Sequence, residues 1–96
     1  MIRIFPDDSK EKNNKYSFLD NKLYLLQHKR GFNKDIYITG IEFRYYCNNN
    51  DTLDKPHDYE KSKTMSTFYW YWNDFKVFEL TDDEMITLRS MEELVN

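Results

Sequence analysis

Segment 67–75 is the feature that most constrains this chain: five aromatic residues in a row, then a polar pair, then a sixth aromatic residue. Aromatic side chains fit the half-buried surface of a sheet and are enriched in strands. Because side chains alternate between the two faces of a strand, the rings divide into two rows. These rows are Phe68, Trp70 and Trp72 on one face, and Tyr69 and Tyr71 on the other. We therefore predict a central β-hairpin, with strands 64–72 and 75–79, whose first row is core and whose tyrosines bind a partner.

Charge is distributed unevenly along the 96 residues, a length that suits one domain, 1–96. Residues 1–47 carry nine Lys/Arg and six Asp/Glu, a net charge of +3. Residues 48–96 carry five Lys/Arg and eleven Asp/Glu, a net charge of −6. An acidic half predicts a basic protein partner and disfavours direct binding of nucleic acid.

The composition also indicates where in the cell the protein is located. The lone Cys47 excludes an internal disulfide and fits a reducing compartment. No apolar run approaches the roughly 20 residues of a membrane span, and residues 1–8 lack the apolar region of a signal peptide. We therefore expect a cytoplasmic protein with no membrane contact. The abundance of residues with A/T-rich codons suggests a low-GC bacterium or one of its viruses, and for a phage-encoded chain the address is the host cell.

The first half of the chain predicts several further strands. Residues 2–5 form a short strand candidate, and 15–19 with 22–27 form a hairpin about Asp20-Asn21. Segment 36–47 is the longest strand signal, but its apolar residues change parity at Gly40. We therefore predict a β-bulge at Gly40. Arg44 and Tyr46 alternate with the inward residues of this strand and are assigned to the partner-binding face.

The C-terminal segment predicts an amphipathic helix. Thr81 and Glu84 have the spacing of a capping box, and Asp82 and Asp83 suit the positive end of the helix dipole. Apolar residues recur at intervals of three and four, which places them on one stripe. The stripe consists of Met85, Leu88, Met91, Leu94 and Val95, and the outward face carries Asp82, Asp83, Glu92 and Glu93.

Together these elements predict an α+β fold. We expect an antiparallel sheet of about five or six strands, with the single C-terminal helix packed on one face. Nine residues are assigned to the core, namely Leu25, Ile41, Phe43, Phe68, Trp70, Trp72, Val77, Leu88 and Met91.

The sequence predicts neither an enzyme nor a cofactor. Loop 48–58 contains Asp51, Asp54, His57 and Asp58, but it lacks the central glycine and the final glutamate of a calcium loop. A solvated loop of turn-forming residues is the preferred interpretation, with no metal site. Neither Cys47 nor either histidine lies in a motif for nucleophilic catalysis, so no catalytic residue is assigned.

A small acidic protein-binding module is therefore the function that the sequence favours. Its predicted partner-binding residues are Tyr69, Tyr71, Arg44, Tyr46, Asp82, Asp83, Glu92 and Glu93. A chain of this kind is similar in type to virus-encoded inhibitors of host defence, such as anti-restriction and anti-CRISPR proteins. That similarity implies a basic, nucleic-acid-binding host protein as the partner.

Two alternatives use the same aromatic face. The first is a single-stranded nucleic-acid-binding protein whose sheet tyrosines stack on bases. The second is a homodimer formed through the aromatic sheet face.

Overall fold

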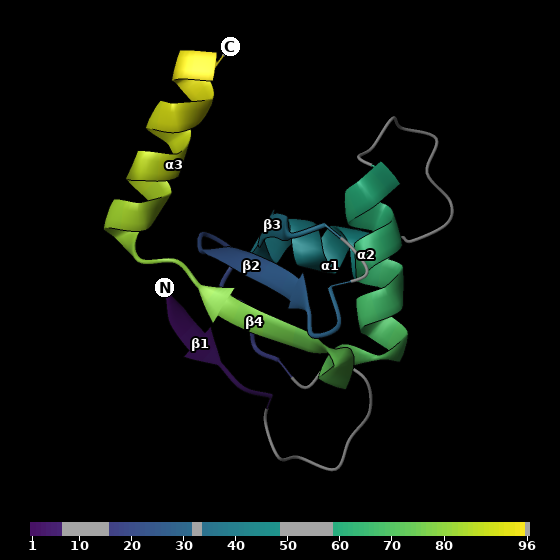
Figure 1. Cartoon of the computed structure of the whole chain (residues 1–96). Helices are drawn as coiled ribbons and strands as arrows, with labels where there is room; N and C mark the ends of the chain where they lie inside the picture. The colour runs from purple at the N-terminus through teal and green to yellow at the C-terminus, as the bar shows by residue number, and fades with distance from the viewer. Residues whose placement is uncertain (7–15, 32–33, 49–58, 96) are drawn as a thin grey trace.

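In the computed structural model, the described residues are 1–6, 16–31, 34–48 and 59–95, without the side chains of residues 47, 48, 59 and 92–95. Over these ranges the chain forms one antiparallel sheet with the strand order β1-β4-β2-β3, together with three α-helices (Figure 1). The strands are β1 (Ile2–Ile4), β2 (Leu23–His28), β3 (Ile36–Thr39) and β4 (Phe75–Glu79). The helices are α1 (Gly40–Asn48), α2 (Tyr59–Trp70) and α3 (Asp82–Val95), and a 3-10 turn, η1 (Trp72–Asp74), precedes β4. The predicted α+β class and antiparallel sheet are confirmed, whereas the number of strands and the single helix are not.

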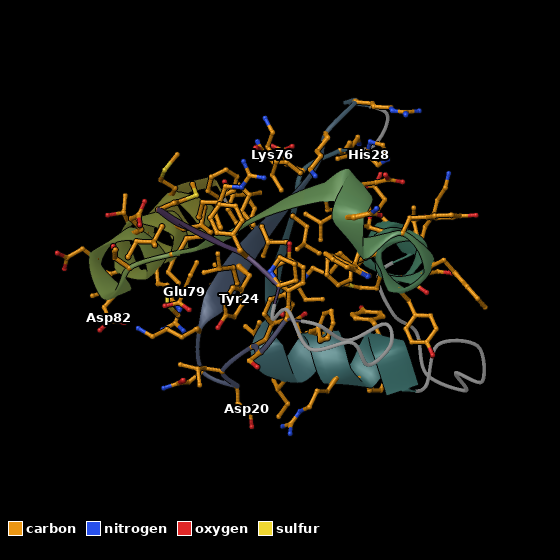
Figure 2. All side chains as sticks on the ribbon, turned by 90° about the horizontal axis from the view of Figure 1, so that it is seen from below. Asp20, Tyr24, His28, Lys76, Glu79 and Asp82 are labelled. Atoms are coloured by element: carbon orange, nitrogen blue, oxygen red, sulfur yellow. The ribbon has the colours of Figure 1, made fainter. Side chains whose placement is uncertain are left out.

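The strand register sorts the side chains of the sheet onto two faces. Leu26 pairs with Val77 of β4 and with Ile36 of β3, and all three are buried on the face that α1 and α2 cover. In Figure 2, Tyr24 lies between the sheet and α1, whereas Lys76 points away from α1. Residues of the opposite parity therefore form a second face, on the side away from α1 and α2.

Aromatic rings fill the space between the first face and the two helices. Phe68 of α2 is fully buried, and its ring centroid lies 5.5 Å from those of Phe43 in α1 and Phe75 in β4. Phe18 stacks on Tyr24 at 4.3 Å. Rings of this size bury about 150–250 Å² each, so contacts between them supply most of the apolar burial that holds α1 and α2 to the sheet.

The predicted aromatic strand is wrong: residues 64–70 belong to helix α2, and the segment becomes a strand only at Phe75. Thr64, Met65 and Phe68 are buried at helical spacing. Trp70 lies two positions beyond Phe68, on the other side of the helix, and is 68% exposed. The strand preference of aromatic residues mainly reflects how their side chains pack. Favourable packing in a helix can therefore override it.

The predicted bulge at Gly40 is also wrong, because β3 ends at Thr39 and α1 begins at Gly40. Thr39 and Glu42 form a capping box: the Glu42 N–H donates to Thr39 Oγ1 at 3.2 Å, and the Thr39 N–H donates to Glu42 Oε1 at 3.0 Å. Helical spacing then buries Phe43 and Tyr46. Tyr46 was predicted to face a partner, but it is a core residue.

The segment before β2 differs from the predicted hairpin as well. Asp20-Asn21 does form a turn, but the described residues 16–19 are not a strand, and β2 pairs with β3 and β4. Residues 16–19 instead contribute two rings, Tyr16 and Phe18, to the aromatic core.

The predicted core is confirmed in part. Four of the nine residues are buried, namely Leu25, Phe43, Phe68 and Val77. Trp72 and Leu88 are half-buried. Three are exposed, namely Ile41, Trp70 and Met91.

Gly40 provides a test of this packing, because a Cβ atom there would collide with the backbone carbonyl of Leu19. We expect Gly40→Ala to lower the free energy of unfolding by about 2 kcal/mol, since overpacking against backbone cannot relax through a rotamer change. Urea titration measures the change. Gly31→Asn is the control, because Gly31 has a φ of 70° and open space around it, and asparagine tolerates that region. Equal stability of the two variants would contradict the close approach at Gly40.

Candidate functional site

Hydrogen bonds and ion pairs hold helix α3 at its start. Its predicted capping box is present: the Thr81 N–H donates to Glu84 Oε1 at 2.9 Å, and the Glu84 N–H donates to Thr81 Oγ1 at 3.2 Å. Lys22 donates to Asp82 at 2.8 Å and holds the pKa of that carboxyl below its ordinary value. The amino group of Met1 donates to the other carboxylate oxygen of Glu84 at 2.7 Å. These contacts fix where α3 leaves the sheet.

Beyond that first turn, α3 runs away from α1 and α2 (Figure 1). The predicted packing of this helix flat on the sheet is therefore not what the structure shows. Leu80, just before the helix, is buried, whereas Met85 and Leu88 are half-buried and Met91 is 58% exposed. The apolar stripe of α3 thus has an incomplete covering among the described residues.

Two hollows lie between this stripe and the sheet, and together we name them the α3 groove. The first has a volume of about 220 Å³, and its lining includes Leu23, Thr39, Glu42, Lys61, Met85 and Arg89. The second has a volume of about 290 Å³, and its lining includes Met1, Leu80, Asp83, Thr87 and Met91. Tyr37 of β3 and Leu88 of α3 line both hollows, so the two are neighbours.

The groove has one fixed polar end. Lys61 Nζ of α2 lies 2.9 Å from Glu42 Oε2 of α1, and the Thr39 N–H and hydroxyl both donate to Glu42 Oε1 at 3.0 Å. Burial opposes ionisation of Glu42, but the hydrogen bonds from Lys61 and Thr39 outweigh it and lower the pKa below its ordinary value of 4.5. A groove that combines apolar side chains with an ion pair at one end suits the binding of an amphipathic ligand.

The structure does not bring the predicted partner-binding residues together on one face. Tyr69 is half-buried in α2, and Tyr71 is exposed just beyond the end of that helix. Arg44 is exposed on α1 and pairs with Asp20 at 2.7 Å. The proposed sheet face of tyrosines is therefore absent.

The acidic residues predicted to bind a partner do share one element, since all four belong to α3. Asp82 and Asp83 are exposed, and Asp83 also lines the second hollow. The side chains of Glu92 and Glu93 lie outside the described residues. Tyr37 was not predicted as a site residue. Its position beneath α3 depends on the strand order, which no pattern of neighbouring residues indicates.

Comparison with protein-family models, with curated proteins and with solved structures finds no match for this chain. No helix within the described ranges is long and apolar enough to cross a membrane. The candidate loop ligands Asp51, Asp54, His57 and Asp58 lie outside the described residues. Elsewhere, over the part of the chain that the structure describes, no three His, Cys, Asp or Glu side chains are placed to hold a metal ion.

The lowered pKa of Glu42 predicts a specific pH dependence. The unfolded chain binds this proton more readily than the folded one, so the stabilisation is complete above pH 4.5 and is lost as the pH falls through the lowered pKa. We expect Glu42→Gln to cost about 1 kcal/mol of unfolding free energy at neutral pH, and to match the wild type once the pH has fallen below the lowered pKa of Glu42.

The matched control for that measurement is Glu60→Gln. It removes the same charge from an exposed ion pair, whose Lys34 Nζ lies 3.2 Å from Glu60. Exposed pairs contribute little, so this variant should change stability by less than about 0.5 kcal/mol. A Glu42→Gln variant that loses stability equally at every pH would show that shape, not charge, explains the effect.

Proposed function

We propose that this protein is a non-enzymatic protein-binding module that holds an amphipathic, cationic segment of its partner in the α3 groove. The observation that carries the proposal is the apolar stripe of α3, which stands above two hollows instead of packing against the core. Amphipathic helices commonly dock in grooves of this kind through side chains spaced by three and four residues. Leu88 and Met91 supply the apolar contact on the helix, and Tyr37 supplies it on the sheet.

The charge of α3 selects the chemistry of the partner. The helix sequence contains five Asp/Glu and one Arg, a net charge of −4. A second copy of the same helix would place like charges against each other, whereas a segment flanked by Lys or Arg would be attracted. Asp83 lies at the rim of the second hollow, where it can pair with such a flanking cation. A basic partner is therefore favoured over a homodimer.

Basic segments of this kind are common in proteins that bind nucleic acid, because they contact phosphates. We propose that the partner is a nucleic-acid-processing or defence protein of the host, and that binding masks its cationic surface. This is the mode of action expected of a virus-encoded inhibitor. Charge complementarity supports this proposal.

A peptide of defined chemistry tests the groove directly. The probe is a labelled helical peptide with leucines at i, i+3, i+4 and i+7 and lysines elsewhere, titrated by fluorescence anisotropy. We expect Met91→Lys to weaken binding at least about tenfold, because it places a charge in the apolar contact. Ile86→Lys is the matched control: Ile86 is also on α3, is 62% exposed and does not line the second hollow.

Two results would contradict this proposal. One is equal weakening by Met91→Lys and Ile86→Lys, which would reduce the effect to net charge. The other is equally tight binding of a peptide in which glutamate replaces every lysine, which would remove the preference for a cationic partner.

Electrostatic steering predicts a separate effect on the association rate. Asp83→Lys should slow association of the lysine peptide about three- to tenfold at low salt, since rim charges act mainly on that rate. The difference should disappear near 0.5 M salt, where the screening length is only about 4 Å. Glu60→Lys on α2 makes the same change in net charge away from α3. Stopped-flow measurements that give the two variants the same rate would exclude steering by Asp83.

A further inference from the structure

A second surface, unrelated to the α3 groove, lies where α2 ends. Trp70 is 68% exposed and Tyr71 is 59% exposed, and the ring of Tyr69 meets that of Trp70 edge-on at 5.6 Å. We name these three residues the aromatic ledge. Large exposed rings side by side are uncommon on a small protein and mark a surface that something covers.

A cationic turn is hydrogen-bonded to the segment that follows the ledge. The Lys29 N–H donates to the Asp74 carbonyl at 2.8 Å, and Lys29 Nζ donates to the Asn73 carbonyl at 2.6 Å. The Asp74 N–H in turn donates to the Tyr71 carbonyl at 2.8 Å. An ammonium group is thus held two residues from the exposed ring of Tyr71. Because its partner is a neutral carbonyl and not a carboxylate, this contact does not neutralise its charge.

Two further cations extend this turn. Arg30 follows Lys29 and is exposed. Lys76 is exposed on β4 and lies opposite Gln27 in the register, one position from His28. Lys76 points away from α1 (Figure 2), whereas the His28 ring belongs to the other face of the sheet and meets the buried ring of Phe75 at 5.1 Å. Three cations, Lys29, Arg30 and Lys76, therefore lie at this end of the sheet together with two carboxylates, those of half-buried Asp74 and of Asp35, which accepts a hydrogen bond from Gln27 at 2.9 Å.

We propose that the aromatic ledge and the 29–30 turn bind single-stranded nucleic acid. Unpaired bases stack on exposed aromatic rings, and the adjacent cations meet the phosphates. An acidic peptide would satisfy the cations alone, and a cationic segment would satisfy the rings alone, through cation–π contacts. A flexible anionic chain that carries flat rings matches both features.

The location of this surface keeps it separate from the α3 groove. The ledge precedes η1 and the start of β4 at Phe75, whereas α3 follows the other end of the same strand, after Glu79. Five residues of strand span about 16 Å, so each surface can be altered without touching the other.

The test is a titration of labelled oligothymidylate of about twelve nucleotides, a length that fits common single-strand site sizes, at low ionic strength. We expect Trp70→Ala to weaken binding at least about fivefold, the effect of losing one stacked base. Ile86→Ala, an equally exposed apolar residue on α3, should leave the dissociation constant unchanged. The double variant Lys29→Gln/Arg30→Gln should reduce the salt dependence of binding, because fewer phosphates are neutralised.

Competition experiments identify which chemical feature of the ligand the surface recognises. Unlabelled oligothymidylate should displace the probe, whereas inorganic polyphosphate and a duplex of the same length should compete poorly, because neither offers unpaired bases. Three outcomes overturn the proposal: no binding by the wild type at low salt, unchanged binding by Trp70→Ala, or equal competition by polyphosphate. Circular dichroism of each variant confirms that a loss of binding does not reflect unfolding.

A protein ligand is distinguished in the same series. If Trp70→Ala weakens the lysine peptide of the groove as much as Met91→Lys does, the ledge belongs to a protein interface and the nucleic-acid proposal is overturned. If only oligothymidylate is affected, the two surfaces act independently, as we propose.

Discussion

The buried ring of Phe68 is the contact that joins the two layers of this protein. It lies 5.5 Å from the rings of Tyr16, Phe43 and Phe75, which belong to the segment before β2, to α1 and to β4. Residues far apart in the chain therefore depend on one side chain for their relative positions. Interiors are close-packed, so moving Phe68 would force rearrangement in every one of these segments.

The position of Phe68 also decides which aromatic residues are exposed. A helix turns about 100° per residue, so Trp70 points roughly 200° away from Phe68 and cannot share its environment. The same ring that secures the core thus presents Trp70 to solvent. In this way one packing contact produces both the stable fold and the proposed nucleic-acid surface.

Helix α3 has the opposite relation to the core, because α1 and α2 already cover the first face of the sheet. Leu88 of its apolar stripe and Tyr37 of the second face line both hollows of the α3 groove. An amphipathic helix with an incomplete covering suits a docking role, since a partner can complete the burial without unfolding anything. In the proposed function, the acidity of α3 favours a basic partner.

Local patterns predicted some elements well, and one such pattern was overlooked. The Thr81–Glu84 spacing located the start of α3, and the same spacing at Thr39–Glu42 caps α1. The Thr39–Glu42 capping box was overlooked because the apolar residues around Gly40 alternate in a way that also fits a bulged strand. Burial of Phe43 and Tyr46 at a spacing of three shows that the same residues also fit a helix.

The candidate surfaces were harder to predict than the elements. The acidic face and apolar stripe of α3 were evident from spacing and composition, but the hollows beneath it depend on Tyr37, which β3 brings there. The tyrosines of segment 67–75 were assigned to a sheet that does not include them. Lys29 gained its place near the aromatic ledge only through the pairing of β2 with β4.

The amino-acid sequence by itself determined the capped helix α3, its acidity, the antiparallel α+β class and the dense aromatic core, because each depends on neighbouring residues or composition. The tertiary structure alone decided that the aromatic run is helical and that α3 stands off the sheet. Five consecutive aromatic residues favour a strand in isolation, but tertiary packing can override that preference. The choice between them is made by which rings can pack against Phe43 and Phe75, and those contacts exist only once the chain has folded.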